Sequence, residues 1–183
     1  MNVVLIGLSG SGKSSVGRAL AQRLGWVFVD TDREIEREAG RRIHEIFDIE
    51  GEAGFRRRET DMLLRVLREG RQVVSLGAGA VVDPANRARL ATGNLVVLLE
   101  AEVDTLLARL ETDQEKEPRP MLASGDPRER LCALKAVRDP IYHAVAAFRV
   151  LTEGKEIADI VATIATQVDA AAASPQGWTG GER

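Results

Sequence analysis

The stretch from residue 7 to residue 14 limits the possible folds of this chain more than any other part of its sequence. It reads Gly-Leu-Ser-Gly-Ser-Gly-Lys-Ser and matches the pattern G-x-x-x-x-G-K-[ST] at every fixed position. An apolar run at residues 3–6 precedes it, and an amphipathic stretch at residues 13–24 follows it. A strand, a glycine-rich loop and a helix in this order direct backbone N–H groups and the positive end of a helix toward one anion. The pattern therefore predicts a phosphate-binding loop, or P-loop.

Several residues of this loop are expected to contact a bound nucleotide, namely Gly10, Ser11, Gly12, Lys13, Ser14 and Ser15. The Lys13 ammonium is placed to bridge the β- and γ-phosphates, and the Ser14 hydroxyl to ligate a Mg²⁺ ion that comes with the nucleotide. The loop thus predicts a nucleoside triphosphate with one Mg²⁺ ion as its ligand. It does not identify the molecule that accepts the phosphate.

Short apolar runs alternate with longer amphipathic stretches along the rest of the chain. The expected strands cover residues 3–6, 27–29, 73–76, 95–99 and 149–151. The expected helices cover residues 13–24, 32–38, 43–49, 54–69, 84–90, 103–110, 127–147 and 157–173. Strands that are apolar throughout, each followed by a helix, are typical of a parallel sheet covered on both faces. We therefore expect an α/β fold with three layers, α/β/α, around a central, mainly parallel five-stranded sheet.

The 183 residues are expected to form one domain over residues 1–173. Within it, residues 31 to about 60 would form a substrate-binding region. Residues 111 to about 126 are polar, charged and contain proline, which favours a mobile lid over an ordinary surface loop. The tail, residues 174–183, is rich in glycine and contains proline, which predicts disorder.

Composition narrows the possible partners and compartment. The net charge of −3 gives no general positive field, so neither nucleic acid nor a membrane surface is an expected partner. The single cysteine, Cys132, rules out an intrachain disulfide and suits a reducing compartment. We therefore expect a cytoplasmic protein, and we expect it to be a monomer.

Two carboxylates, Asp30 and Asp32, follow the expected second strand. At the end of a parallel strand, one carboxylate can face a metal while the other orients a substrate hydroxyl and accepts its proton. Acidic residues ahead of a helix are equally typical of N-caps. The residues alone leave both interpretations open.

Two further patterns concern the acceptor. Arg56 and Glu59 share one face of the expected helix 54–69 and can pair with each other. A guanidinium can also grip a substrate carboxylate through two parallel hydrogen bonds. After the expected strand 73–76 the chain reads Gly77-Ala78-Gly79, where glycine permits close approach of a ligand or simply a tight turn.

Taken together, these motifs resemble the shikimate kinase family, whose P-loop kinase fold is related to that of nucleoside-monophosphate kinases. That family has a P-loop near the N-terminus, D-x-D after the second strand, F-R-x-x-E on a helix and a G-G-G loop after the third strand. An arginine in the lid and an arginine before a proline-tyrosine turn follow. The matching segments here are residues 7–14, 30–32, 55–59, 77–79, 119–122 and 138–142. Their order and approximate spacing hold from residue 3 to about residue 168.

For the acceptor, the resemblance implies transfer of the γ-phosphate of ATP to the 3-hydroxyl of shikimate, in the biosynthesis of aromatic amino acids. Asp32 would hold the attacking hydroxyl. Arg56 and Arg138 would bind the shikimate carboxylate, and the backbone of residues Gly77, Ala78 and Gly79 would add contacts.

For the nucleotide, the resemblance implies that Asp30 lies near Mg²⁺, together with Ser14. Arg109 would pack on the adenine. Arg119 would close with the lid and neutralise charge on the transferring phosphate. The expected catalytic residues are therefore Lys13, Asp32 and Arg119.

Ala78 departs from the family pattern, because the G-G-G loop has glycine at this place. If the position needs a positive φ, alanine costs about 1 kcal/mol there, and its methyl group could reach the substrate pocket. A related kinase for another small acceptor, such as gluconate, quinate or a nucleoside monophosphate, is therefore an alternative. The pair of Arg56 and Arg138 favours an acceptor with a carboxylate. A non-catalytic binding module is a further alternative, although Lys13 and Asp32 are both present.

Overall fold

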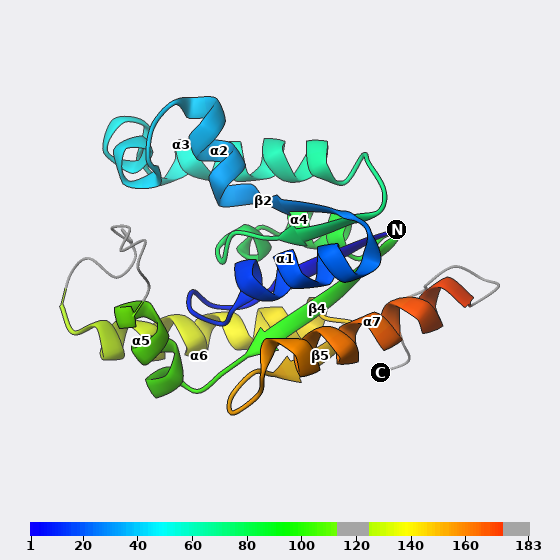
Figure 1. Ribbon diagram of the computed structural model, residues 1–183. Helices are drawn as coiled ribbons and strands as arrows, with labels where there is room; N and C mark the ends of the chain where they lie inside the picture. Colours follow the sequence, from blue (N-terminus) through cyan, green and yellow to red (C-terminus); the bar gives the residue numbers. More distant parts are fainter. Residues whose placement is uncertain (113–124, 174–183) are drawn as a thin grey trace.

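Five parallel strands form one sheet at the centre of the molecule (Figure 1). The computed structural model describes residues 1–112 and 125–173. The strands are β1 (Asn2–Ile6), β2 (Val27–Asp30), β3 (Gln72–Ser75), β4 (Asn94–Glu100) and β5 (Phe148–Leu151). They lie in the order β2-β3-β1-β4-β5, and every neighbouring pair is parallel. The expected parallel five-stranded sheet is confirmed.

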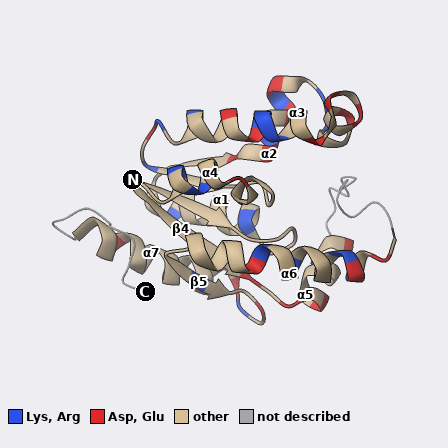
Figure 2. Cartoon of the chain, turned by 180° about the vertical axis from the view of Figure 1, so that it is seen from behind, with Lys and Arg blue, Asp and Glu red and all other residues tan. Residues whose placement is uncertain are grey.

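Helices cover both faces of this sheet. They are α1 (Lys13–Leu24), α2 (Thr31–Ala39), α3 (Ile43–Val66), α4 (Pro84–Leu90), α5 (Val103–Thr112), α6 (Pro127–Val145) and α7 (Ile157–Ala173), with a short 3-10 helix, η1, at Ala80–Val82. Figures 1 and 2, seen from opposite sides, show α1 and α7 on one side of the sheet and α4 and α6 on the other. The three-layer architecture is therefore present.

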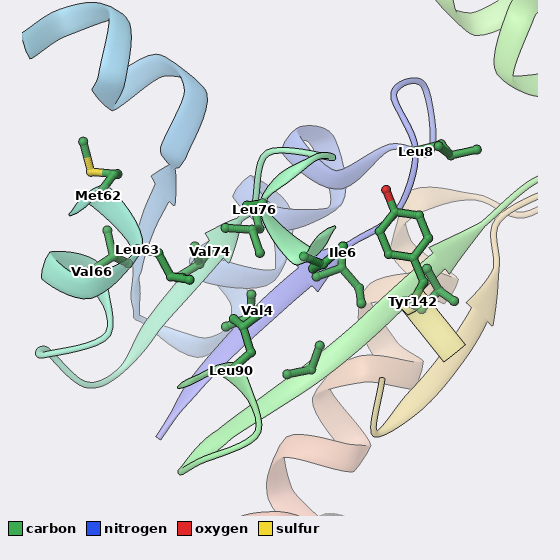
Figure 3. Close-up of a cluster of buried hydrophobic side chains, with 14 of the residues drawn as sticks. Val4, Ile6, Leu8, Met62, Leu63, Val66, Val74, Leu76, Leu90 and Tyr142 are labelled. Atoms are coloured by element: carbon green, nitrogen blue, oxygen red, sulfur yellow. The ribbon is translucent and has the colours of Figure 1, made fainter. Parts of the chain in front are cut away.

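The strand β1 contributes to two separate hydrophobic cores because successive side chains of a strand point to opposite faces. Val4 and Ile6 belong to the core that also holds the buried side chains of α3 and α6 (Figure 3). Val3 and Leu5 belong to the core formed with α1 and α7. The continuous apolar run at the start of the chain reflects this burial on both faces.

The stretches 43–49 and 54–69 were expected as separate helices, and α3 consists of two helical parts that meet at a kink. The kink lies at Gly51, with φ 70° and ψ 176°. The second part ends at Val66, before the expected end at residue 69. Both parts pack on the same core, the first through Ile46 and the second through Phe55.

Charged residues are frequent along α2 and α3 (Figure 2), and some of them join the two helices. Arg65 donates to both carboxylate oxygens of Glu38, at 2.7 and 2.5 Å. Arg42 reaches Glu36 at 3.4 Å, and the same carboxylate accepts the backbone N–H of Ile43 at 3.0 Å. The two helices, which contain the expected substrate-binding region, are therefore tied to each other near the connection between them.

The predicted lid and tail fall largely outside the described residues. Helix α5 extends to Thr112, two residues into the expected lid, and residues 113–124 and 174–183 are not described. Among the helices of the described residues, none is both long and apolar enough to cross a membrane.

Candidate active site

The P-loop connects β1 to α1 in the conformation that its glycines allow. Gly10 and Gly12 have φ angles of 84° and 95°, which residues with a Cβ atom rarely adopt. The first intrahelical bond runs from Val16 N–H to the Gly12 carbonyl, at 2.9 Å. The preceding N–H groups at the start of α1 have no partner within the helix, and the helix dipole makes this end positive. The backbone is therefore built to receive an anion.

The side chain of Lys13 lies over its own loop. Its ammonium donates hydrogen bonds to the carbonyl oxygens of Gly7 and Leu8, both at 2.9 Å. Ser11 is buried, and its hydroxyl has no hydrogen-bond partner among the described residues. The loop thus holds a positive charge and an unsatisfied polar group beside the amides of the helix end.

Ser14 and Asp30 come together although they are 16 residues apart. The Ser14 hydroxyl donates to Asp30 Oδ2 at 2.6 Å and lies 3.4 Å from the Ser75 hydroxyl. The remaining oxygen of Asp30, Oδ1, accepts the backbone N–H of Arg33 at 3.5 Å, as an N-cap of α2 does. The metal and capping interpretations of Asp30 are compatible, because each uses a different carboxylate oxygen.

These hydroxyl and carboxylate oxygens fit a Mg²⁺ ion. Mg²⁺ prefers hard oxygen ligands and usually takes one or two carboxylates together with water and substrate phosphates. Within the described ranges, no group of three or more His, Cys, Asp or Glu side chains could form an all-protein metal cage. Ser14 and Asp30 therefore match a metal that is shared with a bound triphosphate.

Asp32 lies in the first turn of α2 and carries the most perturbed carboxyl group of the site. Its Oδ1 atom is buried and has no hydrogen-bond partner among the described residues, although the residue as a whole is only partly buried. Burial raises its pKa to about 7, the nearby carboxylates of Glu59 and Asp30 add to this effect, and the Lys13 ammonium opposes it. A carboxyl group with a pKa near neutrality can both accept and release a proton.

Glu59 is a buried carboxylate of α3 that interacts with two guanidinium groups. It is only 3% exposed and accepts a short hydrogen bond from Arg56 Nη1. Burial raises the pKa of Glu59, while the charges of Arg56 and, from α6, Arg138 act in the opposite direction. Arg138 is itself only 6% exposed. The two arginines that were predicted as carboxylate ligands therefore come from different helices, and the charges of both act on one buried carboxylate.

Glu59 was not among the site residues predicted from the sequence. Its pairing with Arg56 was predicted, but its burial was not. The signal was present in the F-R-x-x-E pattern, which places Glu59 three residues after Arg56 on the same helix face.

The loop of residues 77–79 packs directly against these side chains. A Cβ atom on Gly77 would lie 2.6 Å from Asp32 Oδ1 and 2.7 Å from Glu59 Oε1. A Cβ atom on Gly79 would overlap the Arg56 guanidinium. Glycine is therefore required at both positions, because these side chains lie too close to the loop backbone to leave room for a Cβ atom. The predicted residues Asp32 and Arg56 and the loop form one cluster.

The expected strain at Ala78 is absent. Among the described non-glycine residues only Arg71 has a positive φ, so Ala78 adopts a conformation that is ordinary for alanine. Its carbonyl oxygen accepts a hydrogen bond from the Tyr142 hydroxyl at 2.7 Å. The backbone of the loop therefore accommodates alanine without the penalty that the sequence suggested.

Arg109 lies beside the P-loop. Its guanidinium donates to the hydroxyl and the carbonyl of Thr152, at 2.9 and 3.0 Å, and reaches the Gly10 carbonyl at 3.4 Å. This places its guanidinium next to the P-loop, and its packing on the adenine stays a prediction. The other predicted nucleotide-side arginine, Arg119, lies outside the described residues.

Comparisons with known proteins agree with this geometry. The family model for shikimate kinase matches residues 9–169. A shikimate kinase from Symbiobacterium thermophilum is 47% identical over 164 residues, which cover 90% of this chain and 94% of that protein. The chain belongs to the shikimate kinase family. The enzyme class that the family resemblance implied, an ATP-dependent kinase, is thereby confirmed.

Solved structures support the same assignment to the shikimate kinase family. The shikimate kinase from Acinetobacter baumannii, solved in complex with shikimate, is 37% identical and superimposes with a TM-score of 0.87 over 94% of this chain and 95% of that chain. A gluconokinase from Sinorhizobium meliloti gives a TM-score of 0.57 at 19% identity, over 92% of this chain and 95% of that chain. The second likeness reflects a shared fold alone.

Proposed function

We propose that this chain transfers the γ-phosphate of MgATP to the 3-hydroxyl of shikimate, giving shikimate 3-phosphate and ADP. The observation that carries this proposal is the buried, unpartnered Oδ1 of Asp32, which lies among the charges of the P-loop lysine and the Arg56–Glu59 pair. An acceptor oxygen in this position needs a polar partner, and the hydroxyl of a substrate can provide one.

In this proposal, the P-loop binds the phosphates of ATP, and Asp32 acts on the substrate hydroxyl that attacks the γ-phosphorus. The amides at the start of α1 and the Lys13 ammonium hold the phosphates, and Lys13 exchanges its bonds to the loop carbonyls for phosphate oxygens. Asp32 orients the substrate hydroxyl and takes up its proton as the oxygen bonds to the γ-phosphorus. The bond from phosphorus to the leaving oxygen of ADP breaks in line with this attack.

The Mg²⁺ ion would be held by Ser14 and Asp30, whose oxygens lie 2.6 Å from each other. When bound, it supplies positive charge that stabilises the phosphate oxygens of the nucleotide. Residues Arg109 and Arg119 would act on the same side, the first at the adenine and the second over the transferring phosphate.

The carboxylate of shikimate would be bound by Arg56 and Arg138. Both guanidinium groups lie near Glu59, which keeps their charges partly balanced in a buried site. A guanidinium binds a carboxylate with two parallel hydrogen bonds, which fixes the orientation of the ring that carries it. The arrangement favours shikimate over a nucleobase, which would need aromatic or amide partners.

The test is release of ADP from MgATP with a panel of acceptors, namely shikimate, quinate, gluconate and several nucleoside monophosphates. We expect rapid turnover with shikimate only. Turnover with a different acceptor would retain the chemistry and overturn the substrate, and nucleotide binding without turnover of any acceptor would favour the non-catalytic alternative. We also propose that the chain acts as a cytoplasmic monomer, which light scattering of the purified protein and fractionation of cells would test.

A further inference from the structure

Tyr142 is a core residue whose polar end reaches the acceptor side of the site. Its side chain is only 1% exposed, and its ring packs in the same core as Ile6 and Leu8 (Figure 3). The hydroxyl donates to the Ala78 carbonyl at 2.7 Å, a distance typical of a good O–H···O bond. The only other part of the site on this helix is Arg138, one turn earlier, whose guanidinium interacts with the same hydroxyl.

The bond to Ala78 determines the direction of a neighbouring backbone donor. In a trans peptide unit the carbonyl and the following N–H point in opposite directions, and the described residues contain no cis peptide. When the Ala78 carbonyl points to Tyr142, the Gly79 N–H must point away from α6. In the described part of the chain, this N–H makes no hydrogen bond to another protein group. Because Gly79 is buried, this N–H is a buried donor without a protein partner, which a bound ligand would satisfy.

The rest of the loop is fixed by other contacts. The Gly77 N–H donates to the Thr31 hydroxyl at 3.0 Å, and the Gly77 and Gly79 carbonyls accept backbone N–H groups at 3.1 and 3.0 Å. The Ala78–Gly79 peptide lies between these points, and Tyr142 is its one hydrogen-bond partner among the described residues. The Arg56 guanidinium packs against Gly79, so a rotation of this peptide would also displace a predicted carboxylate ligand.

We propose that Tyr142 is a positioning residue for the phosphate acceptor: its hydroxyl holds the Ala78–Gly79 peptide so that the Gly79 N–H and the Arg56 guanidinium are set for shikimate. This inference rests on the proposed function. The hydroxyl remains a donor throughout the physiological range, because burial raises the pKa of Tyr142 to about 12. Ala78 contributes to the same end, since alanine restricts the backbone more than the glycine of the family pattern.

The experiment compares the KM values for shikimate and ATP in Tyr142→Phe, which removes only the hydroxyl. Loss of the bond to the Ala78 carbonyl and of the interaction with Arg138 should raise the shikimate KM about tenfold and leave the ATP KM within about twofold. Ala78→Gly alone should raise the shikimate KM less than Tyr142→Phe does, because Tyr142 still holds the peptide. In the double variant, the increase should exceed the product of the two single effects.

A matched control separates this role from simple core stabilisation. Gln72→Met removes another buried side-chain bond to a backbone carbonyl, that of Gln72 to Val66 at 3.3 Å, at the opposite end of β3. It should lower the Tm as Tyr142→Phe does while both KM values stay unchanged. Wild-type turnover of shikimate is measured in the same assay, and its absence would contradict the proposed function. Normal wild-type turnover with an unaltered shikimate KM in Tyr142→Phe, or additive effects in the double variant, would overturn the role of Tyr142.

Discussion

The phosphate side and the acceptor side of the site are built in different ways. The phosphate side consists mainly of backbone groups from one short stretch, residues 7–15, and its lysine bonds to carbonyls of the same stretch. The acceptor side consists of charged side chains from α2, α3 and α6, gathered around the loop after β3. The acceptor side also contains two carboxyl groups, those of Asp32 and Glu59, whose pKa values are raised by burial.

This difference shows where specificity and chemistry are encoded. Backbone amides and a helix end recognise any phosphate chain, so the phosphate side needs only glycines and one lysine in the correct order. Buried charges recognise a particular arrangement of partners, because an unpaired charge in such a place is destabilising. In the proposed function the acceptor side therefore determines which molecule is phosphorylated, and substitutions on the two sides should affect different kinetic constants.

The largest effect is expected for Lys13→Ala on the phosphate side. Removing a charge that acts on the transferring phosphate should lower kcat by about a hundredfold or more, in the range measured for other groups that stabilise transition-state charge. The Lys13 side chain contacts its own loop, so the Tm should change little. Steady-state kinetics and thermal unfolding check both expectations, and near-normal kcat would contradict the assignment of the P-loop.

On the acceptor side, Arg56→Ala should raise the shikimate KM by about tenfold to a hundredfold, as expected for loss of hydrogen bonds between charged groups. The ATP KM should stay within about twofold. Arg56→Lys should fall between, because an ammonium cannot reproduce the two parallel bonds.

Arg56→Ala also leaves Glu59 buried without its short hydrogen bond. The double variant Arg56→Met/Glu59→Gln removes both charges and serves as the control for folding. Equal increases in the KM values for shikimate and ATP, in variants that keep the wild-type Tm, would remove the distinction between the two sides.

The raised pKa of Asp32 predicts the pH dependence of the acceptor side. Only the ionised carboxylate can accept the proton, so kcat/KM for shikimate should rise with pH to a plateau above about 7, the pKa of Asp32 in the folded chain. Below that midpoint it should fall about tenfold for each pH unit. Glu59→Gln removes a neighbouring negative charge and should move the midpoint to lower pH. A profile whose midpoint is the same in both proteins would exclude Asp32 as the titrating group.

The raised pKa of Asp32 also makes stability depend on pH, but stability should fall with rising pH whereas kcat/KM should rise. The folded pKa of Asp32 lies above its ordinary value of 3.8, so the fold favours the protonated carboxyl group. The contribution of this group to the free energy of unfolding is full below pH of about 4 and is lost as the pH rises through about 7. Asp32→Asn should remove this dependence, which urea unfolding at several pH values would show.

The smallest effect is expected for the stability of Ala78→Gly. Because Ala78 has an ordinary backbone conformation, glycine should lower the free energy of unfolding by only about 0.4–1 kcal/mol, through greater freedom of the unfolded chain. Denaturant titration measures this change. If the variant is more stable than the wild type, Ala78 is strained, and this would favour the alternative of a different small acceptor.

The phosphate side could be predicted from sequence nearly in full, and the acceptor side only in part. Residues 7–15 are contiguous, so their pattern, the preceding strand and the following helix are all visible in the chain. Asp32, Arg56 and Arg138 were predicted through motif resemblance, whereas Glu59 and Tyr142 were not predicted as parts of the site. Their proposed roles depend on burial and on distant contacts, such as that between Tyr142 and Ala78 across 64 positions of the chain, and spacing does not reveal these.

The bonds of Lys13 to the Gly7 and Leu8 carbonyls have one more consequence. These two hydrogen bonds hold the loop in one conformation between catalytic cycles. The entropy lost in ordering this segment is then lost once, when the chain folds, and not at each encounter with a nucleotide. The phosphates of an arriving nucleotide meet a loop that is already formed, and they need only displace the Lys13 ammonium. The rate of nucleotide binding should therefore be limited by diffusion and charge rather than by rearrangement of the protein.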